Sequence, residues 1–234
     1  MKTINTPVEN RETRLDCPLC GHKSTPFCRG RIGLYHDCPA CRGIFLDPTF
    51  LPTASSEKER YQTHNNDVTD LRYQQFVSPL VRRVIRHQYA GQKGLDFGCG
   101  NGPVVSFLLR QKGYRLNLYD PFFHNEKGVL RDFYDFIICS EVIEHFHHPA
   151  REFARLAKML VPNGRLYCLT CLFDDKTDFA TWYYKDDHTH VFFYRQESCL
   201  FIRDKFGFQD LTVSGRLLVW QKKASAAGNA LTGP

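Results

Sequence analysis

The sequence predicts an α/β protein in which a small N-terminal module precedes a doubly wound, mostly parallel sheet. Two observations support this prediction. From residue 94 onward, short apolar runs typical of buried strands alternate with longer amphipathic stretches typical of helices. Ahead of them, two Cys-x2-Cys pairs stand at positions 17–20 and 38–41, a spacing that indicates a metal-held unit. The 234 residues suffice for one domain of moderate size together with such a unit.

The composition limits the classes of protein to which the chain can belong. Apolar residues make up 42% of the chain and aromatic residues 14%, which is enough for a buried core. The formal charge of +6, from 31 basic and 25 acidic residues, permits an anionic partner without requiring one. No apolar run is long enough to span a membrane, and residues 1–10 lack the apolar core of a signal peptide. We therefore expect a cytoplasmic protein without a membrane partner, whose ten cysteines are reduced thiols or metal ligands.

The N-terminal module, residues 1–50, is defined by Cys17, Cys20, Cys38 and Cys41. Paired Cys-x2-Cys knuckles of this kind are typical of zinc ribbons, in which four thiolates form a closed, structural Zn²⁺ site. A module of this size is too small to fold on a hydrophobic core alone, so bound zinc would supply much of its folding free energy. The alternative is four unrelated reduced cysteines.

Residues 51–90 are expected to form a linker and lead-in helices. Residues 48–66 combine prolines with small polar and charged residues, which indicates a linker that passes into a short helix. Ser78 and Pro79 predict the start of a second helix, because serine caps helices well and proline is tolerated in the first turn. Apolar residues at helical spacing follow, at Leu80, Val81, Val84 and Ile85.

Residues 91–223 hold the predicted sheet. Strands are expected at 94–98, 114–120, 135–140 and 165–172, with helices at 104–113 and 149–160. Because strands and helices alternate, the sheet should be parallel, with a ligand crevice at the carboxyl ends of its strands. Residues 208–223 predict a closing antiparallel hairpin that turns at Ser214 and Gly215. The small polar tail, residues 224–234, is predicted to be disordered.

The turn after the first of these strands carries the strongest functional pattern. Residues 95–103, LDFGCGNGP, predict a strand, a tight glycine turn and a helix start, which let the backbone approach a nucleotide-like ligand. A dinucleotide-binding turn needs a third glycine where Pro103 stands, and Pro103 instead fits the first helical position. Asp96 at the strand end suits a ligand that carries an ammonium and a sulfonium. Asp120 stands near the distance of about 20 residues beyond the glycine turn at which an acid meets ribose hydroxyls.

Four sequence motifs stand in the order known from one enzyme family. The pattern D-x-G-x-G-x-G at 96–102 resembles motif I of the class I S-adenosylmethionine-dependent methyltransferases, and the resemblance continues through 119–121, 135–145 and 187–193. It implies a Rossmann-like fold and S-adenosylmethionine (SAM) as methyl donor. The residues that the resemblance implies for donor binding are Asp96, Gly98, Gly100, Gly102, Asp120, Pro121, Ser140 and Glu141.

One part of the chain departs from the pattern of this family. Family members usually carry a helix and a further strand between the ribose-binding acid and the fourth strand, which ends in a residue that touches adenine. Here 14 residues separate Asp120 from Asp135, too few for both elements. We therefore expect this side of the sheet to be shortened, and no adenine contact can be carried over. Phe122 or Phe123 offers an apolar wall in its place.

Candidate catalytic residues lie in two segments. Glu141, Glu144 and His145 share one face if their segment is helical, as the resemblance implies. They resemble the metal-binding E-x-x-E-H of the small-RNA 3′-terminal 2′-O-methyltransferases and of ubiquinone-pathway O-methyltransferases, where a later histidine such as His190 completes the set. Such oxygen and imidazole ligands suit Mg²⁺ or Mn²⁺. The alternative is a site without metal, in which His145 packs or caps, because E-V-x-E-H is common across the superfamily.

The second segment is DDHTHVFF at 186–193, which resembles a stretch that commonly lines the acceptor pocket of the family. We hypothesise that His190 is a general base, because a hydroxyl acceptor must lose its proton during methyl transfer. The alternative is a structural hydrogen bond that orients the loop. An aromatic lid, or else ordinary core packing, is expected from Tyr61, His64, Trp182, Tyr183 and Tyr184.

The leading functional prediction is a methyltransferase that modifies an oxygen, or else a carbon or nitrogen, of a small-molecule acceptor. An RNA methyltransferase is the second possibility, since zinc ribbons occur ahead of ribosomal RNA methylating domains. Residues 1–50 hold seven basic and five acidic side chains, which is no strong phosphate-binding surface. The third possibility is a SAM-binding interaction protein without catalytic activity. The sequence does not predict the acceptor, the atom methylated or the oligomeric state.

Overall fold

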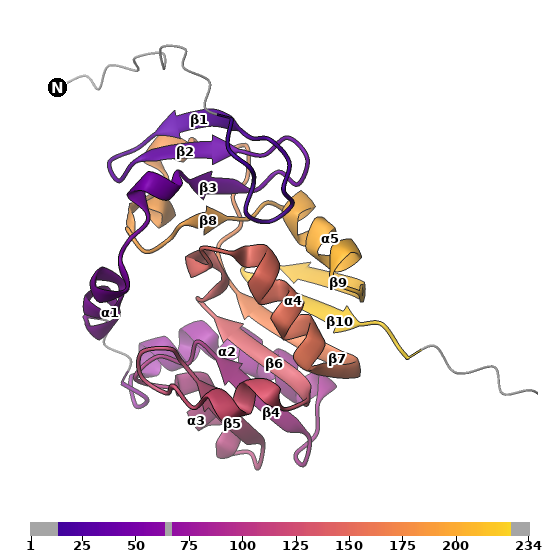
Figure 1. The fold of residues 1–234 in the computed structure, drawn as a ribbon. Coiled ribbons are helices and arrows are strands. Elements are labelled where there is room, and N and C mark those ends of the chain that lie inside the picture. Colours follow the sequence, from indigo (N-terminus) through magenta and orange to yellow (C-terminus); the bar gives the residue numbers. More distant parts are fainter. Residues whose placement is uncertain (1–13, 64–66, 226–234) are drawn as a thin grey trace, which may run out of the picture.

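The computed structural model describes residues 14–63 and 67–225, which form a smaller and a larger β-sheet (Figure 1). Apart from its first two positions, the tail predicted to be disordered lies outside these residues, as does His64. Within the described part of the chain, none of the helices combines the length and apolar character needed to span a lipid bilayer.

The larger sheet contains six strands in the order β5-β4-β6-β7-β10-β9. Their bounds are β4 Lys93–Phe97, β5 Arg115–Tyr119, β6 Tyr134–Ser140, β7 Leu160–Leu169, β9 Phe208–Ser214 and β10 Leu217–Lys222. The first four in this order run parallel, whereas β10 is antiparallel to both β7 and β9. The predicted α/β fold class and the closing hairpin are therefore confirmed.

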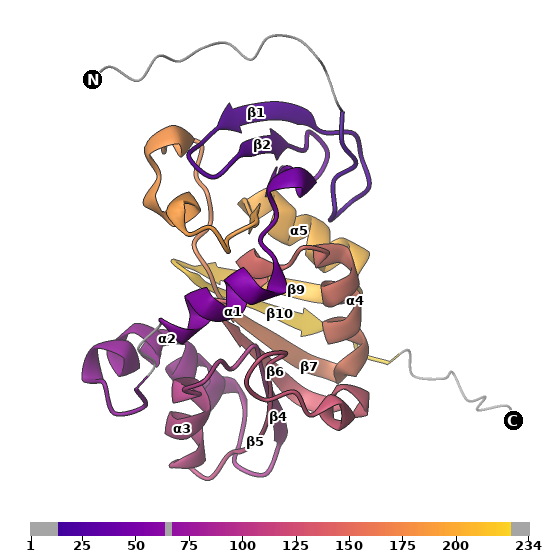
Figure 2. The same cartoon turned by 60° about the vertical axis from the view of Figure 1, so that its left-hand side comes forward.

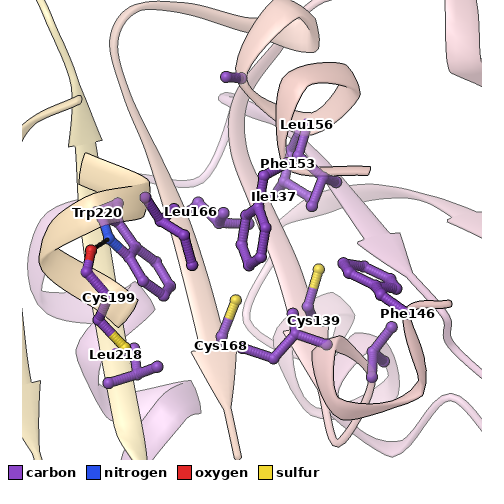
Figure 3. Packing of buried hydrophobic residues seen from close by; sticks show 14 of the residues in the cluster. Ile137, Cys139, Phe146, Phe153, Leu156, Leu166, Cys168, Cys199, Leu218 and Trp220 are labelled. Atoms are coloured by element: carbon purple, nitrogen blue, oxygen red, sulfur yellow. Dashed lines mark hydrogen bonds between the residues drawn. The ribbon is translucent and has the colours of Figure 1, made fainter. Parts of the chain in front are cut away.

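Helices cover both faces of this sheet, as its apolar strands require. One face is covered by α4 (Pro149–Met159) and α5 (Gln196–Lys205), and the other by α2 (Leu71–His87) and α3 (Val104–Arg110). On the first face, Phe153 and Leu156 share one buried cluster with Ile137 and Trp220 (Figure 3). The indole N–H of Trp220 donates to the Cys199 carbonyl at 3.1 Å, so this large side chain is buried without losing its hydrogen bond.

The predicted start of a helix at Ser78 and Pro79 is wrong, because α2 begins seven residues earlier, at Leu71. Asp70 is its cap and accepts the backbone N–H of Arg72. Pro79 therefore lies inside the helix, where it removes one backbone hydrogen bond. The helix continues through it because an amphipathic face packs on the sheet. The residues that this face buries are Val77, Leu80, Val81 and Val84.

The connection from β5 to β6 is as short as predicted. It contains one 3-10 turn, η2 (Lys127–Arg131), and within the described residues β5 is the outermost strand of the sheet on this side. The chain places β5 on one side of β4 and then returns to place β6 on the other. Such a reversal opens a crevice beyond the carboxyl ends of the two neighbouring strands, where ligands of open α/β sheets bind.

The smaller sheet belongs to the N-terminal module but is completed by a distant segment. Its order is β1-β2-β3-β8, and the bounds are β1 Thr25–Arg29, β2 Leu34–Asp37, β3 Ile44–Leu46 and β8 Phe192–Phe193. Below it, α1 (Ala54–Gln62) crosses in front of the larger sheet in Figure 2. Short 3-10 turns complete the fold, namely η1 Pro48–Phe50, η3 Ile143–His145, η4 Phe179–Thr181 and η5 Tyr183–Asp186.

Candidate active site

The glycine turn lies at the switch point of the larger sheet. Gly98 and Gly100 have φ angles of 75° and 65°, in the left-handed region that favours glycine. The N–H groups of Gly98 and Cys99 both donate to the Tyr119 carbonyl, at 2.8 and 3.2 Å, which ties the turn to the end of β5. A Cβ atom at Gly98 would lie 2.6 Å from Val142. The turn thus needs glycine both for its backbone angle and for its contact with the segment after β6.

Asp120 holds the glycine turn from the other side. Its Oδ2 accepts the N–H of Gly100 at 3.0 Å, and its Oδ1 accepts the N–H groups of Phe122 and Phe123 at 2.8 and 3.1 Å. A carboxylate offers about four lone-pair positions, so these bonds leave one for a further donor such as a hydroxyl. Pro121, Phe122 and Phe123 line a cavity beside the glycine turn, where an apolar wall was predicted.

Asp96 lies near the end of β4, buried beneath the turn. Ser106 Oγ donates to its Oδ2 at 2.7 Å, and burial raises the pKa of this carboxyl to about 6. A cation bound next to it would favour the ionised form. Gly102 lines the cavity beside it, and Pro103 is the cap of α3 rather than its first residue.

The predicted helix over Glu141, Glu144 and His145 is wrong. Glu141 has a φ of 54°, so the chain bends sharply after β6, and only the single turn η3 follows. The two carboxylates are nevertheless brought together, because the Tyr184 hydroxyl lies 2.5 Å from Glu144 Oε1 and 3.2 Å from Glu141 Oε2. Arg216 forms an ion pair with Glu141. Tyr184 thus bridges the two carboxylates, and Arg216 holds Glu141 in place. The two glutamates come together through these distant residues and not through helical spacing.

The two glutamates form a buried acid pair. Burial raises the pKa of each to about 7, and for Glu141 the neighbouring Glu144 charge adds to the effect. Glu144 is fully buried, and its Oε2 has no hydrogen-bond partner among the described residues, as is also the case for Glu141 Oε1 and Ser140 Oγ. Unpaired buried oxygens of this kind cost free energy and point to a missing donor or cation.

His145 and His190 stand beside this acid pair, with their ring centroids 4.8 Å apart. Nδ1 of His145 lies 2.8 Å from the Thr189 carbonyl, and Nδ1 of His190 lies 2.6 Å from the Tyr184 carbonyl. A carbonyl only accepts, so both rings carry their proton on Nδ1 and present Nε2 as an acceptor. Burial lowers the pKa of both rings, that of His190 to about 3. One ligand atom from each of Glu144, His145 and His190 lies within 4.8 Å of the others.

A single cavity of about 1360 Å³ joins the glycine turn to this cluster. It is lined by Asp96, Asp120, Ser140, Glu141 and both histidines, so every residue expected to bind the donor borders one space, whereas Glu144 lies just behind its wall. Such a space is larger than a binding site for one drug-sized ligand usually is. The cavity therefore has room for a nucleoside and a second small molecule.

Aromatic side chains line the part of the cavity beyond the histidines. Three of the residues expected to form a lid, Tyr61, Tyr183 and Tyr184, border it, whereas Trp182 is buried in a neighbouring cluster. The Tyr61 ring lies 5.3 Å from that of His145 in an edge-on arrangement.

Polar contacts hold α1 over this cavity, and none of the residues of this helix is buried. These contacts are Ser56 Oγ to His188 Nε2 at 3.0 Å, Glu57 to His147 at 3.1 Å and Arg60 to Asp187 at 2.7 Å.

Arg216 is the most informative residue that the sequence did not single out. Its guanidinium carbon lies 5.3 Å from the Phe76 ring and 5.2 Å from the Tyr184 ring, and it pairs with Glu141. A signal was available, because β10 runs antiparallel to β7 and so begins at the carboxyl end of the parallel strands. A residue just before that strand must lie near the crevice. The roles of Phe76 and Arg60 left no comparable signal.

The four cysteines of the N-terminal module come together as their spacing predicts. The Sγ atoms of Cys17 and Cys41 lie 3.6 Å apart, those of Cys20 and Cys38 lie 3.3 Å apart, and all four fall within 4.8 Å. Thiolates about 2.3 Å from a tetrahedral Zn²⁺ are separated by about 3.8 Å. The donor set and its size therefore fit a closed zinc site.

The two knuckles have the same backbone geometry. The N–H of Gly21 donates to the Cys17 carbonyl, and the N–H of Arg42 donates to the Cys38 carbonyl, both at 2.8 Å. Gly21 and Arg42 both have positive φ angles, 79° and 58°. Each pair of cysteines is thus presented by the same tight turn, as a symmetrical four-thiolate site requires.

The comparisons with known proteins agree with this geometry. A family described as a methyltransferase domain matches residues 70–213. None of the curated proteins compared matches the chain. An O-methyltransferase family protein from Burkholderia thailandensis is 14% identical with a TM-score of 0.50, over 73% of this chain and 64% of that one. Human N-acetylserotonin methyltransferase, solved in complex with SAM, is 13% identical with a TM-score of 0.51, over 74% and 57%.

The chain covers about three fifths of the length of these two structures, and at such low identity the likeness shows a shared fold. The family match extends over more than half of the chain and includes the glycine turn, Asp120 and the acid pair. The chain therefore belongs to the methyltransferase-domain family.

Proposed function

We propose that the protein transfers a methyl group from SAM to an oxygen atom of a small-molecule acceptor. The observation that carries this proposal is the single cavity of about 1360 Å³, which borders the glycine turn at one end and the two histidines at the other. The solved structures of similar fold include an O-methyltransferase family protein and a SAM-bound methyltransferase, which supports the reaction class. The small acceptor is supported by the aromatic side chains that border the cavity beside the two histidines.

The donor would be held by residues at the ends of three neighbouring strands. Asp120 would accept a ribose hydroxyl at its remaining position, while the backbone around Gly98 and Gly100 lies close against the ligand. Asp96 supplies the negative charge that suits the ammonium end, and Ser140 has an unpaired hydroxyl to offer a polar group. When bound, SAM supplies an activated methyl group. The protein has to place the acceptor in line with it and exclude water.

The acceptor would be held at the far end of the cavity. Nε2 of His190 is an acceptor nitrogen and can receive the hydrogen bond of an acceptor hydroxyl, as the general base of the reaction. His145 offers a second Nε2 beside it. A proton taken up by either ring would be stabilised by the neighbouring Glu144 carboxylate, one oxygen of which lies within 4.8 Å of a nitrogen of each ring. At this end of the cavity, the ring of Tyr61 packs against His145 and the ring of Tyr184 packs against His190.

The proposal is tested by methyl transfer to a metabolite mixture. Purified protein, SAM labelled in its methyl group and a deproteinised cell extract should give labelled products of low mass. Asp120→Ala should bind SAM about 10- to 100-fold more weakly, because it loses a charged acceptor worth about 1.5 to 3 kcal/mol. Calorimetry with SAM measures that loss directly. Asp174→Ala, which changes an exposed acid outside the cavity, is the control.

The same experiment separates the other possible functions. Label that appears in polymer and disappears after ribonuclease treatment would identify RNA as the acceptor instead. Binding of SAM without transfer of label to low-mass products or to polymer would favour the interaction protein. If the wild-type protein gives no heat with SAM or with its demethylated product, then the proposed reaction is excluded.

A second candidate function is metal-assisted methylation, favoured by the convergence of Glu144, His145 and His190. Two imidazole nitrogens and one oxygen of the buried Glu144 carboxylate form a donor set that suits Mg²⁺ or Mn²⁺. These three residues would hold the ion, and both rings are already oriented by carbonyl groups, as metal-binding histidines usually are. A bound ion would lower the pKa of a coordinated hydroxyl.

Titration with Mn²⁺, followed by electron paramagnetic resonance, tests this candidate. The wild-type protein should bind one ion at micromolar concentration, and Glu144→Gln should weaken that binding by at least about tenfold. His148→Ala removes an exposed histidine from the border of the same cavity and should leave the binding unchanged. Equal, weak binding by all three proteins would leave only the metal-free form of the reaction.

We further propose that Cys17, Cys20, Cys38 and Cys41 bind one structural Zn²⁺. The proposal is supported by their convergence and by the matching turns of the two knuckles. Four protein thiolates leave no open position, so the ion would stabilise the fold and take no part in chemistry.

A further inference from the structure

The loop that carries His190 is attached to the N-terminal module. Directly after His190, Val191 accepts the backbone N–H of Leu46 at 2.9 Å, and β8 then pairs with β3 through Phe45 and Phe192. A Cβ atom at Gly43, at the start of this contact, would lie 2.4 Å from the Phe192 ring. Gly43 of the module and Phe192 of the loop therefore pack so closely that a larger side chain does not fit between them.

The same loop is attached on its other side to the turn that carries Glu144 and His145. The N–H of Val191 donates to the Glu144 carbonyl at 2.9 Å, and the Tyr194 hydroxyl donates to the Ile143 carbonyl at 2.9 Å. His190 is thus held between β3 of the module and η3 of the larger domain. Its position relative to Glu144 depends on how the module is docked.

Arg195 fixes that docking. Its side chain is 4% exposed, and its guanidinium forms two hydrogen bonds with the carboxylate of Asp37, at 3.2 and 3.1 Å. It also donates to the Arg42 carbonyl at 2.7 Å and to Asp175 at 2.8 Å. Asp37 directly precedes Cys38, and Arg42 directly follows Cys41. One buried cation therefore holds both ends of the second cysteine knuckle.

A neighbouring hydroxyl strengthens this link. Ser198 Oγ donates to the Cys41 carbonyl at 2.9 Å and accepts the N–H of Arg195 at 3.2 Å. The contacts between the knuckle and the chain after β8 are thus charged or hydrogen-bonded and mostly buried. Such contacts have defined directions, unlike apolar packing, and they specify one docked arrangement.

We propose that Arg195 is a positioning residue, which holds the second cysteine knuckle against the chain after β8 and thereby sets the place of His190 beside Glu144 and His145. The N-terminal module then supports the acceptor end of the cavity by holding His190 in place, instead of binding a separate partner. The donor end lies on β4 and β5, which the module does not join. This inference rests on the proposed function, in that His190 faces the acceptor.

The inference predicts that weakening the link disturbs His190 and leaves SAM binding intact. Arg195→Lys keeps the charge but loses the two-pronged contact with Asp37. Ser198→Ala is a milder change that removes only the hydroxyl link. The matched control is Arg203→Lys on α5, the helix that Arg195 caps, because Arg203 pairs with the exposed Asp204, away from the knuckle. All three variants and the wild type are studied with zinc bound.

Two measurements report on the folded protein. Ring ¹⁵N resonances give the tautomer of His190, which should be the Nδ1–H form in the wild type and in Arg203→Lys, and a mixture in Arg195→Lys. Hydrogen exchange at the Val191 amide should accelerate about tenfold in Arg195→Lys and by a smaller factor in Ser198→Ala. The Kd for SAM should stay within about twofold of the wild-type value.

The outcomes separate this inference from the proposed function. Unchanged His190 resonances and Val191 exchange in both Arg195→Lys and Ser198→Ala, in protein that binds SAM, would overturn the inference alone. A loss of SAM affinity equal to the change at His190 would also overturn it, because the effect would then be general. If the wild-type protein does not bind SAM, then the proposed function fails, whereas the structural link can still be measured by exchange.

Discussion

Gly98→Ala is expected to reduce SAM affinity by at least about 100-fold. The new methyl group would lie 2.6 Å from Val142, far inside contact distance, so the turn or the segment after β6 has to move. A movement of the turn would carry the N–H of Gly100 away from Asp120, and a movement of the segment after β6 would displace Glu141, which borders the same cavity. A loss of this size corresponds to about 2.7 kcal/mol, comparable to one charged hydrogen bond and part of the packing. Calorimetric titration with SAM measures it.

Gly207→Ala is the matched control for this prediction. Gly207 has a φ of 78°, close to the 75° of Gly98, but an added Cβ meets nothing within 4 Å. Both variants should lose about 1 to 2 kcal/mol of stability from the left-handed backbone, measured by denaturant unfolding. Only Gly98→Ala should lose affinity. Equal SAM binding by the two variants would show that the turn does not contact the donor.

Removal of one cysteine from the four-thiolate cluster is expected to cost about 4 kcal/mol or more. Cys38→Ser should fail to retain zinc and should lower the Tm by roughly 8 to 16 °C, since 1 kcal/mol shifts the Tm of a chain of this size by about 2 to 4 °C. The loss should spread beyond the module because Cys17, Cys38 and Cys41 belong to the same buried cluster as α4 and the larger sheet. Metal analysis and calorimetric melting measure the two effects.

Cys28→Ser is the control for this second prediction. Cys28 is half-buried in β1 of the same module but lies outside the four-thiolate cluster. It should keep one zinc per chain and change the Tm by less than about 4 °C, because a surface-near substitution typically costs under about 1 kcal/mol. Wild-type protein that purifies without zinc and melts at the same temperature with and without a chelator would contradict the assignment.

Much of the fold could be predicted because it depends on local chemistry. The turn at 98–102 is recognisable since few residues other than glycine accept the backbone angles seen at Gly98 and Gly100. The hairpin turn at Gly215, with a φ of 58°, left the same kind of signal. The cysteine pairs are recognisable because each knuckle is one short turn whose two ligands are fixed three residues apart.

The errors arose where long-range packing overrides local preference. Pro79 marks a helix start on local grounds, but the buried face of α2 continues through it. Glu141 has an unfavourable positive φ because its carboxylate is held by Arg216 and Tyr184, which lie 75 and 43 positions away. Such distant partners leave no local pattern in the sequence. The predicted helical face was therefore wrong, although Glu141, Glu144 and His145 do converge.

The connection between the N-terminal module and the larger sheet could not be predicted from the sequence. Strand β8 has two residues, too few for any periodic pattern, and Arg195 carries no motif. Both matter only because distant segments, β3 and Asp37, lie beside them in the folded chain. Residues that position others through buried contacts are therefore found from the structure rather than from the sequence.

The strand that β8 lends to the N-terminal sheet has a consequence for biosynthesis. Phe192 lies far beyond Leu46 in the chain, so a ribosome that has completed the cysteine knuckles must add most of the remaining chain before their sheet can close. Contacts so far apart in sequence form late and slowly. The N-terminal module of the nascent chain would therefore keep an unpaired strand edge until β8 has been made, and chaperones recognise such edges. Metal binding during translation would not by itself complete the module.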